Sequence, residues 1–179
     1  MNTNRAFLLI ATLALGICCR AATLPDACGD DSVRFDVKTL KHQAPPPAPA
    51  AAMAQIVFVE NFEQNQGLFC IECKVTTRVG VDGHWVGADY GNSYIVDNVA
   101  PGEHHLCVDW QSAMPKMRQK VGLLSLTAAP GQVYYAEIKV RMIQYDNTTE
   151  RRLVLEPLDN DEGKYLVKIT PLAKAASKK

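Results

Sequence analysis

The sequence lacks an excess of charge of either sign. Its 179 residues carry 19 Lys and Arg against 19 Asp and Glu, so the formal net charge is zero. A nucleic-acid-binding domain normally presents a basic patch or stripe, and this balance gives no sign of one. The same balance argues against a membrane binder held by charge alone. The composition is otherwise globular, with 47% hydrophobic and 21% charged residues.

The sequence also lacks an apolar run long enough to cross a bilayer, which takes about 20 residues. Residues 6–19 are apolar apart from Thr12. Residues 1–5, which precede them, contain one basic residue, and Arg20 interrupts the apolar run. This layout is typical of a secretory signal peptide. Small residues at Cys19 and Ala21 predict a signal peptide of residues 1–21, with cleavage before Ala22. We therefore expect export to the periplasm or cell envelope.

Lipidation at Cys18 or Cys19 is the alternative form of processing. A bacterial lipoprotein needs a small residue before the modified cysteine, and Ile17 is bulky and β-branched. We expect membrane attachment only if one of these two cysteines carries a lipid.

Helical periodicity is absent from the chain beyond the signal peptide, where short apolar or alternating runs predict strands instead. These runs are residues 33–37, 55–60, 75–81, 84–87, 92–96, 104–110, 121–126, 133–142, 153–155 and 165–169. Turn residues separate them, and Asp82-Gly83 suits a type I′ hairpin because both positions need positive φ. The pattern predicts an all-β fold, an antiparallel β-sandwich of about seven to nine strands with no substantial helix in the mature chain.

The composition divides the chain into five segments. After the signal peptide we expect an N-terminal tether with a short strand at 22–43 and a Pro/Ala-rich linker at 44–54. Prolines in such a linker favour extended polyproline II geometry. The β-sandwich domain follows at 55–172, and a disordered basic tail ends the sequence at 173–179.

An ordered set of turn motifs carries a family resemblance. Residues 78–87 end one strand in Val81-Asp82-Gly83 and return through Gly87, and Pro101-Gly102-Glu103-His104 opens a later strand. This order is similar to the PEGA-like pattern and most resembles exported bacterial proteins of domain of unknown function 2846. The resemblance covers roughly residues 55–110. It implies a small PEGA-like or transthyretin-like β-sandwich at the cell envelope, with no established activity.

Four cysteines remain after cleavage: Cys28, Cys70, Cys73 and Cys107. An even count in an oxidising compartment predicts two disulfides, for which three pairings exist. We favour Cys70 with Cys73 and Cys28 with Cys107. Cys107 lies on the strand face opposite Leu106, Val108 and Trp110, where the N-terminal tether could cross it.

Two alternatives for the cysteines remain open. The Cys70–Cys73 pair has the spacing of a redox motif, although it leads into a strand rather than a helix N-terminus, where the dipole would activate a thiol. Cys70, Cys73, His105 and Cys107 could instead complete a tetrahedral zinc site, with His104 as a substitute ligand.

Catalytic signatures are missing. His104 and His105 are adjacent on a strand and so point to opposite faces. Ser93, Ser112 and Ser125 lack a nucleophile elbow. The acidic group Asp159, Asp161 and Glu162 has no EF-hand spacing and is typical of a solvated turn. We predict no enzyme activity and no cofactor.

Two function classes fit these observations. The first is a noncatalytic envelope module that contacts another envelope protein or a surface polymer. The second is a small-ligand or carbohydrate binder, because Trp85, Tyr90 and Tyr94 flank a loop with Asp89 and Asn92. Aromatic rings stack on sugars and the polar side chains would bind hydroxyls. The competing interpretation of these rings is that Trp85 and Tyr94 belong to the core.

Overall fold

The computed structural model of the chain describes residues 25–41, 45–61, 75–111 and 121–178. Ten strands and one short helix lie in these ranges. The strands are β1 (Phe35–Leu40), β2 (Ala54–Glu60), β3 (Thr76–Val81), β4 (His84–Tyr90), β5 (Ser93–Val99), β6 (Gly102–Trp110), β7 (Gly122–Ala128), β8 (Val133–Gln144), β9 (Thr149–Leu158) and β10 (Leu172–Ser177). The helix is α2 (Asn160–Ile169). The predicted signal peptide lies outside the described residues.

The strands form two sheets, which confirms the all-β sandwich. One sheet has six strands in the order β1-β10-β5-β2-β8-β9, and the other has four in the order β4-β3-β6-β7. The strand number, ten in the described ranges, exceeds the predicted seven to nine. The sheets are also not wholly antiparallel, since β2 pairs with β8 and β10 with β5 in parallel.

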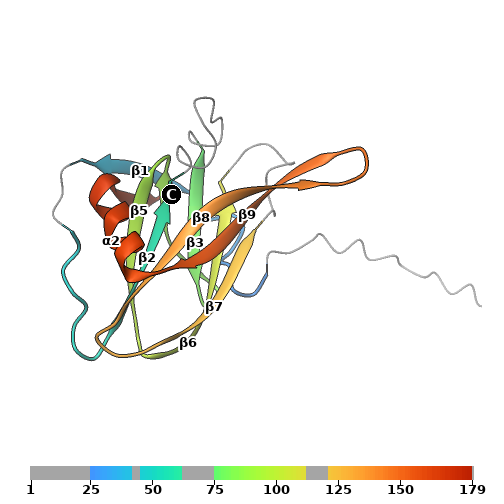
Figure 1. Cartoon of the computed structure of the whole chain (residues 1–179). Helices are drawn as coiled ribbons and strands as arrows, with labels where there is room; N and C mark the ends of the chain where they lie inside the picture. The colour runs from blue at the N-terminus through green and yellow to red at the C-terminus, as the bar shows by residue number, and fades with distance from the viewer. Residues whose placement is uncertain (1–24, 42–44, 62–74, 112–120, 179) are drawn as a thin grey trace, which may run out of the picture.

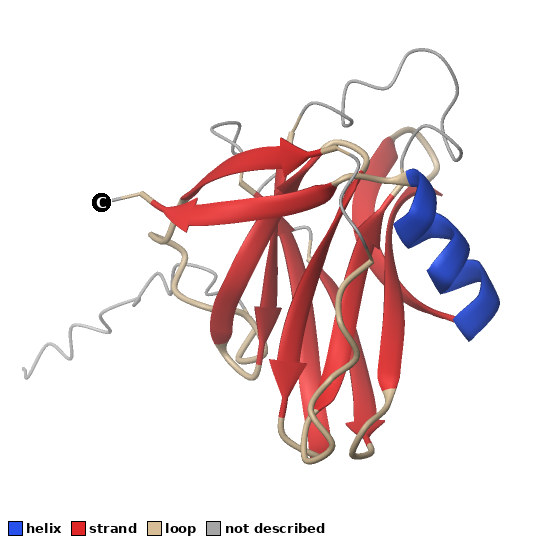
Figure 2. Ribbon diagram, turned by 90° about the vertical axis from the view of Figure 1, so that its left-hand side faces the viewer, coloured by secondary structure: helices blue, strands red, loops and turns tan. Residues whose placement is uncertain are grey.

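The core lies between the two sheets. Its large members include Phe58 on β2, Leu106 and Trp110 on β6, and Ile138 on β8, all essentially inaccessible to solvent. A second apolar cluster covers the other face of β2, where Val57 and Val59 meet α2. Because both faces of β2 are covered, all seven of its residues are buried. Figure 2 shows α2 lying against one side of the sandwich.

The prediction of no substantial helix is wrong, because α2 covers residues 160–169. The sequence pattern had predicted a turn at 160–163 and a strand at 165–169. Asp159 caps α2 by accepting hydrogen bonds from the backbone N–H groups of Asp161 and Glu162, each at 2.9 Å. A carboxylate at this position satisfies donors that have no partner within the helix. Gly163 is buried, and a Cβ there would lie 2.2 Å from the ring of Tyr135, so this glycine permits close packing.

The chain ends also correct the predicted domain bounds. β1 lies in the segment predicted as a tether, which confirms the short strand there. It pairs antiparallel with β10, whose residues after Leu172 were predicted to be part of a disordered tail. The alternating Ala173 and Ala175 give β10 little side-chain volume, and Ala175 reaches the β4 backbone at Gly87. In Figure 2 this β1–β10 ribbon crosses over the other strands, so both segments belong to the sandwich.

The proline-rich segment also contacts the sandwich. Residues 45–53 have no regular secondary structure, as a linker would, but Pro45, Pro46 and Pro47 line one wall of a cleft of about 590 Å³ against β4, β5 and β10. The Gln55 side-chain amide donates to the Pro47 carbonyl at 3.2 Å. Among the described residues, no helix is long and apolar enough to span a membrane.

Candidate functional site

A disulfide joins Cys28 to Cys107 on the outer face of the four-stranded sheet. The two Cα atoms are 5.2 Å apart although 79 positions separate them in the sequence. The structure therefore forms the pairing favoured for these two residues. The bond also removes Cys107 as a thiolate, and with it one ligand of the alternative zinc site. Cys70 and Cys73 lie outside the described residues.

The segment around Cys28 lies across the sheet as an N-terminal strap, defined as residues 25–34. Its backbone carbonyls accept hydrogen bonds from the sheet below. The Gly83 N–H donates to Ala27 at 3.2 Å, and the Trp85 indole N–H donates to Asp30 at 2.8 Å. A Cβ at Gly29 would lie 2.3 Å from the Trp85 ring, so the strap and this ring are in close contact.

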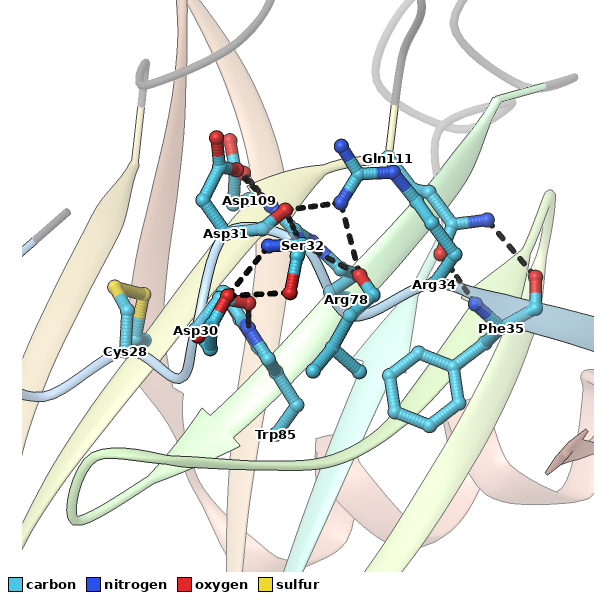
Figure 3. A network of polar contacts seen from close by, with 12 residues as sticks. Cys28, Asp30, Asp31, Ser32, Arg34, Phe35, Arg78, Trp85, Asp109 and Gln111 are labelled. Atoms are coloured by element: carbon cyan, nitrogen blue, oxygen red, sulfur yellow. Dashed lines mark hydrogen bonds and ion pairs between the residues drawn. A yellow bond between two sulfur atoms is a disulfide. The ribbon is translucent and has the colours of Figure 1, made fainter. Parts of the chain in front are cut away.

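Arg78 is the centre of the contacts beneath the strap. Its guanidinium is 1% exposed, pairs with buried Asp109 and lies 3.1 Å from the Asp31 carboxylate. It also donates to the carbonyls of Asp31 and Val33 at 3.2 and 2.9 Å, and stacks over Trp85 at 4.3 Å from the ring centroid. Figure 3 shows these groups converging from β3, β4, β6 and the strap. The arrangement is a closed junction that fixes the strap.

Gln111 extends this junction at the end of β6. Its side-chain amide makes the two hydrogen bonds that the backbone of a neighbouring strand would make. The side-chain carbonyl accepts from the Phe35 N–H at 2.6 Å, and the side-chain NH₂ donates to the Phe35 carbonyl at 2.8 Å. Sequence analysis did not single out Arg78, Asp109 or Gln111. The available signal was the charge at Arg78 and Asp109, each beside apolar residues of its strand.

The three candidate ligand-contact rings do not meet. Trp85 is half-buried under the strap, and Tyr94 is 2% exposed within the cluster beneath α2. Tyr90, which is 44% exposed, is the one freely accessible ring of the three. The structure therefore places them in separate environments. Tyr94 belongs to a buried apolar cluster, as the core interpretation expects, whereas Trp85 lies outside the core, beneath the strap.

The two adjacent histidines have different surroundings, as the strand alternation predicts. His104 is buried, with Nδ1 2.7 Å from Asp82 Oδ2 and Nε2 2.7 Å from the Ala100 carbonyl. His105 is exposed, and its Nδ1 lies 3.0 Å from Ser125 Oγ. Asp82 also accepts from the His105 backbone N–H at 2.8 Å, which ties the Asp82-Gly83 turn to β6.

These contacts shift two pKa values. Burial lowers the pKa of His104, but its hydrogen bonds to Asp82 and Ala100 outweigh that effect and raise it above its usual value. Burial raises the pKa of Asp82, but the His105 N–H and the His104 ring lower it overall. The pair is therefore ionised together over a wide pH range and serves to hold the turn.

The acidic residues near 160 act on the helix rather than on a metal. Asp159 is the cap of α2, and Asp161 and Glu162 occupy its first turn, where the helix dipole favours negative charge. In the described ranges, no group of three or more His, Cys, Asp or Glu side chains is arranged to hold a metal ion.

A pair of buried carboxyl groups is the least expected feature. Glu60 ends β2 and Asp89 lies near the end of β4, and neither side chain is accessible to solvent. Burial, the charge of Asp89 and the contact with its carboxyl raise the pKa of Glu60 well above its usual value. Burial raises the pKa of Asp89 to about 7. A single acidic residue in each strand gave no sequence signal that the two would meet.

The β8–β9 hairpin extends beyond the rest of the sandwich. β8 pairs with β2 over Val133–Ile138, whereas its pairing with β9 continues to Gln144 opposite Thr149. Residues 139–144 thus belong to a two-stranded arm, and Figure 1 shows this arm extending past the remaining strands. Met142 and Tyr145 near its tip are 58% and 47% exposed.

The base of the arm carries a ladder of ion pairs. Lys139 lies 2.6 Å from Glu137 and 3.2 Å from Glu156, and Arg141 also pairs with Glu156. These contacts span both strands where the arm leaves the sheet. They add stiffness to a hairpin that, as an isolated pair of strands, would be marginally stable.

Comparison of the chain with protein-family models, with curated proteins and with solved structures finds no match.

Proposed function

We propose that this chain is a noncatalytic exported module of the cell envelope that binds another envelope protein through the tip of its β8–β9 hairpin. The observation that carries the proposal is the arm itself, which presents Met142 and Tyr145 to solvent beyond the edge of the sandwich. Large apolar side chains in such a position are typical of an interaction site. The ion pairs at the base connect the two strands where the arm leaves the sheet.

The charges on the arm define the partner's chemistry. Arg141 and Arg152 stand directly opposite each other, and both side chains are exposed. Each has one acidic neighbour on the arm, Glu156 for Arg141 and Glu150 for Arg152, which offsets part of their repulsion. Like charges directly opposite destabilise a strand pair by a few tenths of a kcal/mol up to about 1 kcal/mol. A partner with acidic side chains around an apolar centre would relieve this repulsion and cover Met142 and Tyr145.

The proposed location rests on two supports. The apolar run at residues 6–19 is typical of a signal peptide, and disulfides such as Cys28–Cys107 persist in oxidising compartments. We also propose that the chain has no enzyme activity, and the surroundings of its acidic and histidine side chains support this proposal. Glu60 and Asp89 have no access to substrate, and His104 is held between Asp82 and Ala100.

A site-specific cross-linking experiment tests the proposal. A photoreactive phenylalanine analogue replaces Tyr145 at the tip or, as the matched control, Tyr165, an exposed tyrosine on α2. In cells that export the full chain, we expect one discrete adduct from position 145 and none from position 165. Mass spectrometry should identify an envelope protein, and the purified protein should bind the unmodified chain.

Charge and apolar variants complete the test. Met142→Glu and Arg152→Glu should each abolish the adduct from position 145 while leaving the thermal unfolding midpoint within a few degrees of the parent. Equal adducts from positions 145 and 165, or an adduct that survives both substitutions, would contradict the proposal. An adduct with a surface polymer instead of a protein would also contradict it.

A further inference from the structure

The space between the two sheets becomes polar at one end. Along β2 the inward positions are Ile56, Phe58 and then Glu60, and along β3 they are Val81, Val79 and then Thr77. Thr77 stands opposite Asp89 in the β3–β4 ladder, so their side chains share the inner face. Three polar side chains therefore occupy positions that apolar residues hold elsewhere in the core.

The oxygen atoms of this group lie in a buried, acidic environment with few hydrogen-bond donors. The four carboxyl oxygens of Glu60 and Asp89 and the Thr77 hydroxyl are fully buried. The two carboxyls contact each other, and the donors beside them are the Thr77 hydroxyl and the backbone N–H groups of Thr77 and Asp89. Two such carboxylates repel each other, and removing them from water costs several kcal/mol per ion. A proton held between the two carboxyls offsets part of these costs, as their raised pKa values indicate, and a divalent cation bound by both carboxylates would offset more.

Arg78 does not provide that charge. It follows Thr77 on β3 and therefore points to the opposite face, where it pairs with Asp109 and Asp31. The neighbouring inward position across β3–β6 is Trp110, whose indole carries no charge. On the six-stranded sheet, the residues beside Glu60 are Ser93 on β5 and Ile138 on β8, which are also neutral.

We propose that Glu60, Asp89 and Thr77 form a calcium-binding site between the two sheets. The donor atoms are all oxygen, which suits a hard cation and argues against zinc or copper. The two carboxylates can offer four oxygens and the hydroxyl a fifth, and Ca²⁺ takes six to eight. Ca²⁺ accepts irregular arrangements and bidentate carboxylates, whereas Mg²⁺ demands a near-octahedral shell and keeps most of its water.

Trp110 allows metal binding at this site to be measured by luminescence. Its ring is 1% exposed and lies beside Thr77 on the inner face, whereas Trp85 lies on the outer face under the strap. Tb³⁺ replaces Ca²⁺ at oxygen sites and luminesces when a nearby tryptophan is excited. The oxidised full-length chain should therefore show tryptophan-excited Tb³⁺ luminescence that Ca²⁺ displaces. Trp85→Phe should keep at least half of this signal.

Variants at the carboxyl pair decide whether the signal comes from this site. Glu60→Gln and Asp89→Asn should each reduce the luminescence at least tenfold. The matched control, Glu156→Gln at the exposed ion pairs of the arm, should leave it unchanged. Equilibrium dialysis of the unaltered chain against Ca²⁺ should find about one ion per chain. This measurement needs no variant, so it holds even if an amide substitution prevents folding.

The stability of the unaltered chain gives an independent readout. Millimolar Ca²⁺ should raise its thermal unfolding midpoint, and Mg²⁺ at the same concentration should raise it less. The proposal is overturned if dialysis finds no bound Ca²⁺, or if the luminescence is the same in Glu60→Gln as in the parent. An equal response to Mg²⁺ would overturn the assignment to calcium.

Discussion

Arg78 and Asp109 face each other across the β3–β6 ladder, and both side chains are buried although they point away from the core. The N-terminal strap covers them from outside and adds Asp31 and two backbone carbonyls to the shell around the guanidinium. The strap therefore covers this part of the outer face of the four-stranded sheet and keeps it from solvent. Its removal would expose a buried ion pair to water.

Arg78→Met should destabilise the fold strongly. The substitution keeps much of the side-chain volume but leaves Asp109 buried without its cation, which typically costs about 3–5 kcal/mol. Urea unfolding of the oxidised chain measures the loss. The control Arg152→Met, at an exposed position, should change stability by less than about 0.5 kcal/mol. The double variant Arg78→Met/Asp109→Leu should recover part of the loss, and a double variant no better than the single one would contradict the assignment.

The disulfide should hold the strap in place. Without the Cys28–Cys107 bond the unfolded chain gains conformational freedom, and a native disulfide typically contributes about 2–4 kcal/mol. The double variant Cys28→Ser/Cys107→Ser should therefore unfold at lower urea concentration, and amide hydrogens of residues 25–34 should exchange faster than in the parent. Cys70→Ser/Cys73→Ser is the control, since it keeps the Cys28–Cys107 bond. Unchanged exchange in the strap would mean that the Arg78 contacts alone retain it.

The fold class followed from the sequence because strands signal themselves locally. Alternating or short apolar runs and the Asp82-Gly83 turn predicted nine of the structure's strands as separate runs. The sequence did not predict α2 because its buried positions span little more than one helical turn. These positions are Gly163, Leu166 and Val167. A glycine among acidic residues is typical of a turn, and its contact with Tyr135 depends on a strand distant in the sequence.

The site residues were harder to predict for the same reason. The Cys28–Cys107 pair could be proposed because a disulfide needs only two cysteines and strand alternation placed Cys107 on the outer face. Arg78 with Asp109, and Glu60 with Asp89, depend on the register of neighbouring strands and on which sheets face each other. A one-residue change of register would move each of these side chains to the other face. Such information is not present in a single strand's pattern.

Asp159→Ala should destabilise α2. The substitution removes the acceptor for the N–H groups of Asp161 and Glu162, and loss of an N-cap side chain costs about 1 kcal/mol. Chemical denaturation measures the change. Lys164→Ala, at an exposed position within the helix, should be nearly neutral because alanine favours helix. Equal effects of the two substitutions would mean that the Asp159 cap contributes nothing to stability.

Gly83 and Gly131 offer a matched comparison of two positive-φ turns. Their φ angles are +81° and +72°, so a Cβ strains the backbone at both positions. This strain costs roughly 1–2 kcal/mol. At Gly83 the added Cβ would also lie 2.9 Å from the Asp26 carbonyl in the strap, whereas nothing lies within 4 Å at Gly131. Gly83→Ala should therefore lower the thermal unfolding midpoint more than Gly131→Ala. A smaller effect at Gly83 would contradict the placement of the strap over this turn.

His104 should make stability depend on pH near neutrality. Its hydrogen bonds to Asp82 and Ala100 favour the protonated ring and raise its pKa in the folded chain above the usual value of 6.5. A raised pKa means that the folded state binds the proton more tightly than the unfolded state. The resulting stabilisation is fully present below pH 6.5 and is lost as the pH rises through the folded-state pKa. Asp82, with its lowered pKa, remains ionised throughout this window.

The comparison of the parent with His104→Gln isolates this contribution. Glutamine cannot take up the proton, and any effect of the other titrating groups is common to both chains. We expect the parent's advantage in unfolding free energy, measured in urea from pH 5.5 to pH 9, to be largest at the acidic end and to shrink as the pH rises. A constant difference between parent and His104→Gln across the range would mean that His104 is neutral in the fold, and that Asp82 holds it by a hydrogen bond alone.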